Sequence, residues 1–516
     1  MSTISSSVII NQSDIDNETY TWPVTINSGT QENSITITLG TNIELSNVSQ
    51  YFIIGSEYIT INGNNKLLTI TNVTNYPGFV QNGYVSSDET IKTSGFNNVT
   101  IKDLTLTSNN STLADYQGWI CQSGFAYNTI QYTVNINNCI NSGIISGNYS
   151  GGIFGAYSLG TATSCINNGL ITDNGNLSDS NRGGTGGIFG GSSSGITVLC
   201  INNGEVQGDY SGGIFGWNSY GTATSCINNG LITDNGNLND IYIGLTGGIF
   251  GGISSGTASS CINNGNIQGY LSGGIFGTGS RETASSCINN GNIQGYLSGG
   301  IFGTGSTGTS SSCTNNGIIR GDNSGGIFGA QSSGTANNCI NNGLITDNGN
   351  INNNSNGLTG GIFGTSSSGI ASSCINKGEI RSENSGGIFA SYTLSGTANN
   401  CISISNIIGY KAGGIFGAYA DNKSISNNSI VVGKLVGLLT GIIYGYRGND
   451  TINGYVNYEI YSLTTQYANS GLICQRVIEL FKKNDYDANN AFPIYSYYMN
   501  KYSLIKLSKK AFQEIY

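Results

Sequence analysis

Short stretches of alternating apolar and polar residues, separated by Gly and Asn, run along most of the chain. In the first 116 residues the alternation is plain at Ser34–Leu39 (Ser-Ile-Thr-Ile-Thr-Leu), at Tyr58–Ile61 and at Val99–Leu106. Alternating β-branched residues bounded by Asn and Gly are typical of strands with one buried face. The pattern therefore predicts an all-β protein built from many short strands.

A repeat replaces this simple alternation between residue 139 and about residue 420. Each of ten units begins with Cys, usually within Cys-Ile-Asn-Asn-Gly, and carries Gly-Gly-Ile-Phe further on. Successive Gly-Gly pairs are 26, 27 or 35 residues apart, and a period in this range is the signature of a repeat architecture. The residues that open the ten units are Cys139, Cys165, Cys200, Cys226, Cys261, Cys287, Cys313, Cys339, Cys374 and Cys401.

A unit of this size offers about three short strands and cannot bury its own apolar side chains. Stacking equivalent positions at about 4.8 Å per coil gives ten units a rod on the order of 48 Å long, in which each strand pairs with the coils on either side. We therefore predict a parallel β-helix (β-solenoid), right-handed because crossovers between parallel strands nearly always are. We expect an N-terminal β-helical segment over 1–116 and the repeat solenoid over 117–445, including a degenerate eleventh unit at Ser429.

The remaining segment, residues 446–516, differs in pattern and charge. Residues 475–484 and 503–516 have helical spacing, and residues 475–516 carry seven Lys or Arg against four Asp or Glu. We expect a small, partly helical C-terminal cap that covers the open β edge, since an uncovered edge invites end-to-end association. The alternative is an assembly or docking element.

Residues that recur at one position of every unit should stack into ladders. Cys is small and often buried, so we expect the ten unit cysteines to be free, buried thiols, with disulfides or a metal as the alternative. No Cys-x-x-Cys spacing occurs, and Cys121 and Cys474 lie outside the ladder. The Asn two residues after the unit Cys should hydrogen-bond from coil to coil. Of the adjacent Ile and Phe, we expect Ile to face inward and Phe to pack at a corner or beneath a loop; the alternative is an exposed Phe stripe.

Three units are nine residues longer than the others, and each extension begins with Ile-Thr-Asp. A solenoid accepts insertions where a coil turns at the surface, so all three should leave the rod along one edge. A decorated turn without a ligand is one interpretation, and a binding edge is the other. The residues of this candidate partner edge are Asp173, Asp234 and Asp347.

The units with Gly-Gly-Ile-Phe-Gly and an upstream Cys-Ile-Asn-Asn-Gly resemble the GLUG-type repeat, written Gly-Gly-Leu-Val-Gly in many members. The match covers residues 139–445, and the runs Ile59–Asn64 and Asn98–Leu104 resemble opening coils of pectate-lyase-type β-helices. The GLUG resemblance implies a β-solenoid of the kind found in surface and adhesin-like proteins of bacteria and of large AT-rich DNA viruses. It supplies no catalytic residues.

Charge narrows the function classes. The chain has 19 Lys and Arg against 28 Asp and Glu, no His, and no basic run in the repeats, so we do not expect nucleic-acid binding. No apolar run is long enough to span a bilayer, and the first residues lack a secretory signal. We therefore expect synthesis in the cytoplasm and no membrane insertion.

The charged residues of the repeats that could serve catalysis are dispersed. Glu205 and Glu379 lie six units apart, and the three extension Asp residues never fall in adjacent coils. Arg320 and Arg381 are the candidate cations. Polysaccharide-cleaving β-helices need an acidic cluster on one face, so we expect no enzyme activity, no catalytic residue, no cofactor and no metal.

These features favour a non-enzymatic structural or surface protein: a component of a virion, fibre or cell exterior built around a rigid rod. Its partners would be further copies of the chain or other shell and surface proteins, and its location the surface of a virion or other particle. A second hypothesis is an adhesin that binds a glycan or receptor along the extension edge. A polysaccharide-active β-helix enzyme is the third.

Overall fold

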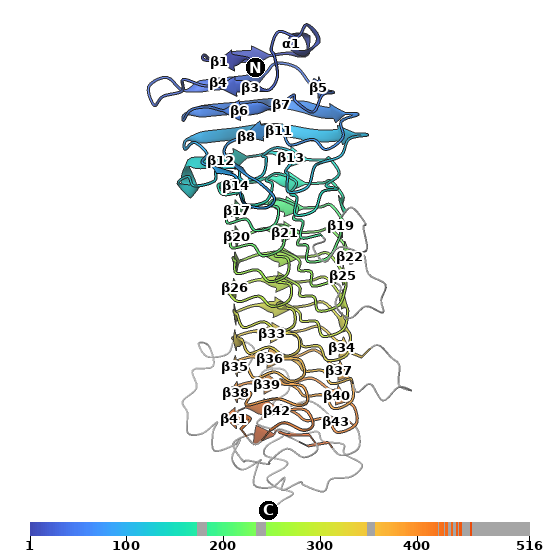
Figure 1. Ribbon diagram of the computed structural model, residues 1–516. Helices are drawn as coiled ribbons and strands as arrows, with labels where there is room; N and C mark the ends of the chain where they lie inside the picture. The colour runs from blue at the N-terminus through green and yellow to red at the C-terminus, as the bar shows by residue number, and fades with distance from the viewer. Residues whose placement is uncertain are drawn as a thin grey trace, which may run out of the picture.

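The computed structural model describes residues 1–172, 183–233, 244–347 and 357–421, followed by 423–427, 429–431, 435–436, 440–441, 443–445 and 455–456. These residues form one elongated stack of coils with the N-terminus at one end (Figure 1). Helix within these ranges is confined to α1 (Gln12–Asp16) and the 3-10 turn η1 (Gln131–Thr133), and neither could cross a bilayer. The predicted β-solenoid is confirmed. The predicted helices over 475–484 and 503–516 lie outside the described residues.

The N-terminal segment consists of wide coils whose main strands pair in parallel. The longest are β7 (Ile59–Thr71) and β11 (Val99–Asn109), which lie side by side with one register shift. Beyond them α1 lies at the end of the stack (Figure 1). The other strands of the segment are β1 (Thr3–Ile4), β2 (Val8–Ile10), β3 (Val24–Ile26), β4 (Ile35–Leu39), β5 (Ile43–Leu45), β6 (Phe52–Ile54), β8 (Val80–Gln81) and the antiparallel pair β9 (Tyr84–Val85) and β10 (Lys92–Thr93).

The repeats continue this segment without a break in the pairing. β11 pairs with both β12 and β13, through Val99 with Val134 and Thr105 with Ile140. One wide strand is thereby succeeded by two short strands per coil. Residues on both sides of the 116/117 boundary therefore belong to one stack.

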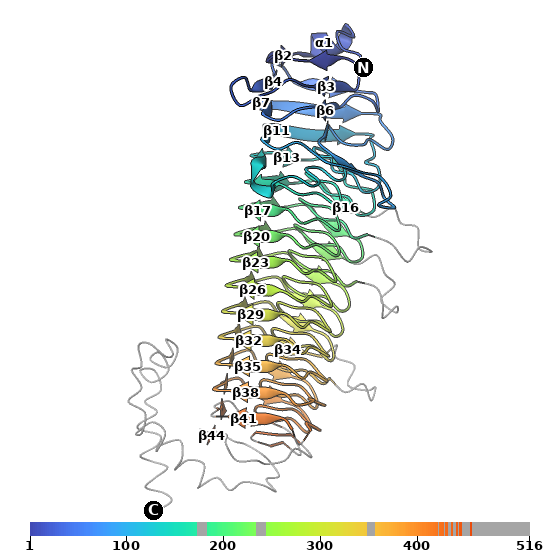
Figure 2. The ribbon, with the colours of Figure 1, turned by 60° about the vertical axis from the view of Figure 1, so that its left-hand side comes forward.

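Three parallel stacks of short strands run through the repeats, and Figure 2 shows the first from β17 to β41. The first stack contains β12 (Val134–Asn137), β14 (Thr161–Thr163), β17 (Ile196–Val198), β20 (Thr222–Thr224), β23 (Thr257–Ser259), β26 (Thr283–Ser285), β29 (Thr309–Ser311), β32 (Thr335–Asn337), β35 (Ile370–Ser372), β38 (Thr397–Asn399) and β41 (Ile425–Asn427). The second contains β13 (Ile140–Asn141), β15 (Ile166–Asn167), β18 (Ile201–Asn202), β21 (Ile227–Asn228), β24 (Ile262–Asn263), β27 (Ile288–Asn289), β30 (Thr314–Asn315), β33 (Ile340–Asn341), β36 (Ile375–Asn376), β39 (Ile402–Ser403), β42 (Ile430–Val431) and β44 (Tyr455–Val456). The third contains β16 (Ile171–Thr172), β19 (Val206–Gln207), β22 (Ile232–Thr233), β25 (Ile267–Gln268), β28 (Ile293–Gln294), β31 (Ile319–Arg320), β34 (Ile345–Thr346), β37 (Ile380–Arg381), β40 (Ile407–Ile408) and β43 (Leu435–Val436).

A left-handed residue before each unit Cys turns the chain from the first stack to the second. In one coil this corner is Ser286, with φ 53°; we call it the inner corner because it joins the first two strand stacks. Ser286 itself is exposed, whereas the neighbouring Ala284 and Cys287 are fully buried. The corner residue is Ser or Asn in nine of the ten units, with Leu199 as the exception. Short polar side chains therefore satisfy this turn almost throughout.

The Gly-Ile-Phe part of each coil bends, so that adjacent side chains both enter the core. The amides of Ile275 and Phe276 donate to one acceptor, the carbonyl of Ile301 in the next coil, at 3.0 and 2.9 Å. In a flat strand these side chains would point to opposite faces, but both are fully buried. The prediction for Ile is confirmed, and the alternative of an exposed Phe stripe is wrong.

Close approach between coils explains the Gly four residues after the unit Cys. A Cβ on Gly291 would lie 1.9 Å from the carbonyl oxygen of Gly265 in the preceding coil. A Cβ on Gly317 would meet the carbonyl oxygen of Gly291 at the same distance. Backbone atoms of the preceding coil leave no room for a side chain at Gly291 and Gly317, so the stacking requires glycine there.

Candidate functional site

The ten unit cysteines lie along one line inside the rod, and all are fully buried. Each thiol donates to the carbonyl two residues earlier in its own coil. Cys287 also lies 3.5 Å from the carbonyl oxygen of Ala258 in the preceding coil. All ten are free thiols. Cys121 is buried as well, but it pairs with Phe154 of the next coil. It therefore lies in the row of the Phe residues and not in that of the unit cysteines.

Thiol reagents should distinguish these buried cysteines from an accessible one. Burial raises the pKa of the Cys165 and Cys374 thiols well above their ordinary value, and the thiolate is the reactive species. We expect at most one of the twelve cysteines to react in the native protein and all twelve in denaturant. Raising the pH from about 7 to about 9 should leave the native count unchanged, because the reagent cannot reach a fully buried thiol at either pH.

The matched control is Cys474→Ser, which should reduce the native count to none and the denatured count to eleven. Two or more reactive thiols in the native wild type would contradict a buried ladder. A denatured count below twelve without reductant would instead indicate disulfides.

Two Asn ladders run along the rod in opposite directions. Inside, Asn263 donates to Asn289 and Asn289 donates to Asn315, each amide-to-amide distance being 2.8 Å. Outside, the exposed Asn290 donates to Asn264 of the preceding coil at 2.9 Å. The buried Asn amides also donate to the carbonyl of the Gly two residues later. The inner ladder thus satisfies polar groups that would otherwise be unpaired in the core.

The ten Phe rings form an unbroken stack. Centroids of successive Phe rings lie 4.1 to 5.1 Å apart, with ring planes within 14° of parallel. Tyr444 continues the stack at 5.0 Å from Phe416 and donates its hydroxyl to the carbonyl of Ser424. All ten Phe side chains are fully buried. The coil spacing imposes this face-to-face arrangement, which isolated aromatic pairs adopt less readily.

The charged candidates from the sequence do not gather into a catalytic site. Glu379 forms an ion pair with Arg381 within its own coil, and Glu205 accepts a hydrogen bond from Gln207. Arg320 is exposed at the end of β31. Asp347 follows β34. The described residues include no group of three or more His, Cys, Asp or Glu placed to hold a metal ion. Asp173 and Asp234 lie outside the described residues.

Two rows of left-handed residues define an outer edge of the rod beyond the third strand stack. From Tyr116 to Asn384, the backbone amide of each first-row residue donates to a carbonyl of the next coil, that of the residue just before the next first-row residue. The second row repeats this pattern from Tyr157 to Tyr392. We call the two rows together the aromatic edge. The first row consists of Tyr116, Tyr149, Gly184, Tyr210, Leu245, Leu271, Leu297, Asn323, Leu358, Asn384 and Lys411. The second consists of Tyr157, Ser192, Asn218, Ile253, Gly279, Gly305, Gln331, Ser366, Tyr392 and Tyr419.

The three extensions rejoin the rod along this edge. Gly183, Gly244 and Gly357, the first described residues after each extension, accept hydrogen bonds at one register, from the first-row residue of the preceding coil. The strands that precede the extensions are β16, β22 and β34, which belong to one stack. The extensions therefore leave and return on a single side.

Four half-buried rings cluster near the N-terminal end of the edge. Tyr116 stacks on Tyr149 with centroids 5.0 Å apart and on Tyr157 at 6.0 Å, and Trp217 meets Tyr149 edge-on at 5.7 Å. The ring of Tyr149 lies over Gly184 of the next coil, where a Cβ would come within 2.9 Å of it. The glycine in this coil therefore makes room for the ring.

The Tyr157 and Tyr210 phenols, at this end of the edge, have raised pKa values and stay neutral at ordinary pH. Burial, with the nearby Glu89 carboxylate second, raises the pKa of Tyr157. Burial, with Asp209 second, raises the pKa of Tyr210. These hydroxyls therefore remain able to donate hydrogen bonds.

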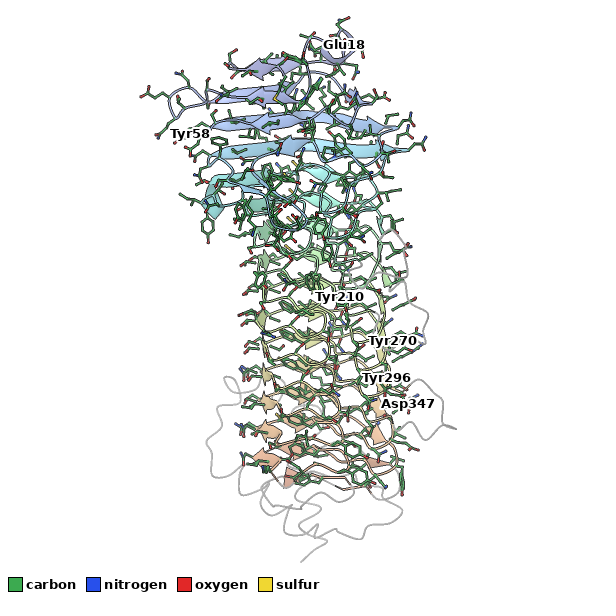
Figure 3. All side chains as sticks on the ribbon, viewed as in Figure 1. Glu18, Tyr58, Tyr210, Tyr270, Tyr296 and Asp347 are labelled. Atoms are coloured by element: carbon green, nitrogen blue, oxygen red, sulfur yellow. The ribbon has the colours of Figure 1, made fainter. Side chains whose placement is uncertain are left out.

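A second aromatic cluster lies near the other end of the edge. Tyr392 stacks on Tyr419 at 5.1 Å. The Lys411 ammonium donates to the Tyr419 hydroxyl at 2.6 Å and lies 4.9 Å from the ring centre of Tyr410. Tyr210, in the same coil as Trp217, is followed further down the rod by Tyr270 and Tyr296 (Figure 3).

The sequence prediction places the partner edge on the extension Asp residues and misses these aromatic side chains. A signal was present, because Tyr recurs just before the Gly-Gly pair, in Asn-Tyr-Ser-Gly-Gly, Asp-Tyr-Ser-Gly-Gly and Gly-Tyr-Leu-Ser-Gly-Gly. Whether these Tyr side chains lie at an outer edge depends on the left-handed backbone conformation of the coil, and the repeat pattern does not predict that conformation.

Comparison with known proteins adds no activity to this geometry. No protein-family model matches the chain, so the GLUG-type resemblance remains an expectation carried by its motif residues. No curated protein matches it either. Among solved structures, the chain is similar to a Bacteroides ovatus protein described as a "putative immunoglobulin A1 protease", with 15% identity over 67% of this chain and 86% of that one and a TM-score of 0.22. A likeness of this size supports no statement about function.

Proposed function

We propose that the protein is a non-enzymatic structural component of a particle or cell exterior, in which the solenoid serves as a rigid rod. The observation that carries this proposal is the unbroken Phe stack from Phe154 to Tyr444. Each coil contacts its neighbours through this stack and through the Cys and Asn ladders, so bending the rod would disturb close-packed contacts in several coils. A rod of this kind holds its two ends at a fixed separation, as a fibre or shell element requires.

The dispersed charges favour this function over catalysis. Glu379 forms an ion pair with Arg381, and Glu205 accepts a hydrogen bond from Gln207, each within its own coil. Polysaccharide cleavage by a β-helix needs acidic groups that act together. The structural function therefore ranks ahead of the enzymatic one.

Electron microscopy tests the proposal directly. Purified protein should appear as stiff rods, and gold-labelled antibody should mark the outside of particles or envelopes from the native source. Antibody absorbed with purified protein is the control. Labelling confined to the cytosol, with none on particles or envelopes, would refute the proposal.

An adhesin is the second candidate function. The half-buried aromatic side chains of the aromatic edge favour it, because aromatic rings that are partly accessible along one edge are suited to recognition and a structural rod does not need them. A rod that carries such an edge could both span a distance and hold a ligand.

A further inference from the structure

The aromatic edge uses residues that its backbone geometry disfavours. Left-handed backbone suits Gly and Asn, whereas a bulky side chain there is strained. The first row nevertheless holds Tyr149, Tyr210 and Leu271 at φ 57°, 58° and 61°. The second row holds Tyr157 and Tyr392 at φ 57° and 54°. The chain therefore places bulky side chains at several positions where small ones would fit more easily.

The inner corner shows that this choice is not imposed by the coil. It demands the same left-handed geometry, yet nine of its ten residues are Ser or Asn. The first row of the aromatic edge itself accepts Gly184, Asn323 and Asn384 in three coils. Strained residues that persist without a structural need point to function. The Tyr and Leu side chains are therefore candidates for contact with a ligand.

The shape of the edge favours a long, narrow ligand. The two rows extend over the whole repeat region, with an aromatic cluster near each end. Tyr149 and Lys411 stand nine coils apart in the first row, which is about 43 Å at the usual coil spacing. A stable protein partner would instead need a compact patch of about 800 Å² on each side.

The charges beside the edge disfavour an anionic polymer. The residue just before the first row is acidic in four coils, at Asp115, Asp209, Asp322 and Glu383. Lys411 is the one cation of the two rows. Nucleic acids and sulfated or uronic-acid glycans need the opposite balance. A neutral chain rich in hydroxyl groups fits better, because carboxylates and phenols can hydrogen-bond to it.

We propose that the aromatic edge binds a neutral polysaccharide chain that lies along the rod; this deepens the adhesin function given above as the second candidate. The C–H faces of sugar rings would pack on Tyr116, Tyr149 and Trp217 at one end and on Tyr392 and Tyr419 at the other. Sugar hydroxyls would bond to the neighbouring carboxylates and phenols. Because two clusters hold one chain, affinity should depend on chain length.

Affinity electrophoresis with defined polysaccharides tests the proposal. The probes are xylan, mannan, galactan, a mixed-linkage β-glucan and a chito-oligosaccharide length series, with heparin as the anionic control. We expect retardation by at least one neutral polysaccharide and none by heparin. Affinity for the retarding polymer should rise with length until a fragment spans about 40 Å. Retardation by none of the neutral polymers, or by heparin alone, would overturn the proposal.

Asn substitutions separate binding from stability. Tyr149→Asn combined with Tyr392→Asn should weaken binding at least tenfold. The unfolding midpoint should change little, because Asn suits left-handed backbone and this gain offsets the lost ring contacts with Tyr116 and Tyr419. Tyr132→Asn is the matched control, since Tyr132 is exposed on η1 and belongs to neither row. Unchanged binding by the double variant would overturn the proposal. Failure here would leave the structural function intact, because labelling of particles tests that function separately.

Discussion

Replacing Phe302 with Ala is expected to lower the free energy of unfolding by about 3–5 kcal/mol. The ring is fully buried and stacks on Phe276 and Phe328 at 4.9 and 4.8 Å. Truncation leaves a void between the two neighbouring rings. These rings cannot move together to fill it, because the strand pairing sets the spacing of the coils. Urea unfolding followed by circular dichroism measures the change.

The control for this truncation is Tyr296→Ala, which removes an aromatic ring from the same repeat unit. Tyr296 is half-buried at the outer edge and is not part of the Phe stack. We expect it to cost clearly less than the loss of Phe302. Hydrogen exchange should also show the effect of Phe302→Ala in the adjacent coils first, since each coil contacts only its neighbours. Equal losses in both variants would show that the internal stack adds nothing specific.

Replacing Asn289 with Ala is expected to destabilise the protein by about 2–6 kcal/mol. The amide accepts from Asn263 and donates to Asn315. Its removal leaves one buried N–H of Asn263 without its acceptor and the carbonyl oxygen of Asn315 without its donor. Each buried polar group that loses its partner costs about 1–3 kcal/mol. The same urea titration measures the loss.

The neighbouring Asn290 offers an unusually close control. It has the same side chain, belongs to a ladder of the same spacing and donates to Asn264, but it is exposed to water. Water can replace its hydrogen bonds, so Asn290→Ala should change stability by no more than about 0.5 kcal/mol. If both substitutions cost the same, burial is not what makes the inner ladder important.

The periodic residues were predictable because in-register stacking puts identical residues together. Cys287 lies beside Cys313, and Asn289 beside Asn315, because one repeat unit of the sequence forms one coil of the structure. The direction of a side chain was less predictable. Ile275 and Phe276 are adjacent, and only the bend that points both amides at one carbonyl brings both side chains into the core.

The sequence alone was sufficient to predict the repeat, the parallel stacking, and the Cys, Asn and Phe ladders. Each repeat unit forms one coil, so residues at the same position of successive units must lie next to one another. Folding in three dimensions decided where the coil turns, and therefore which side chains point outward. The backbone conformation at single residues controls those turns. The identity of Tyr149 does not predict its left-handed conformation, with φ 57°. The aromatic edge emerged only once that geometry was known.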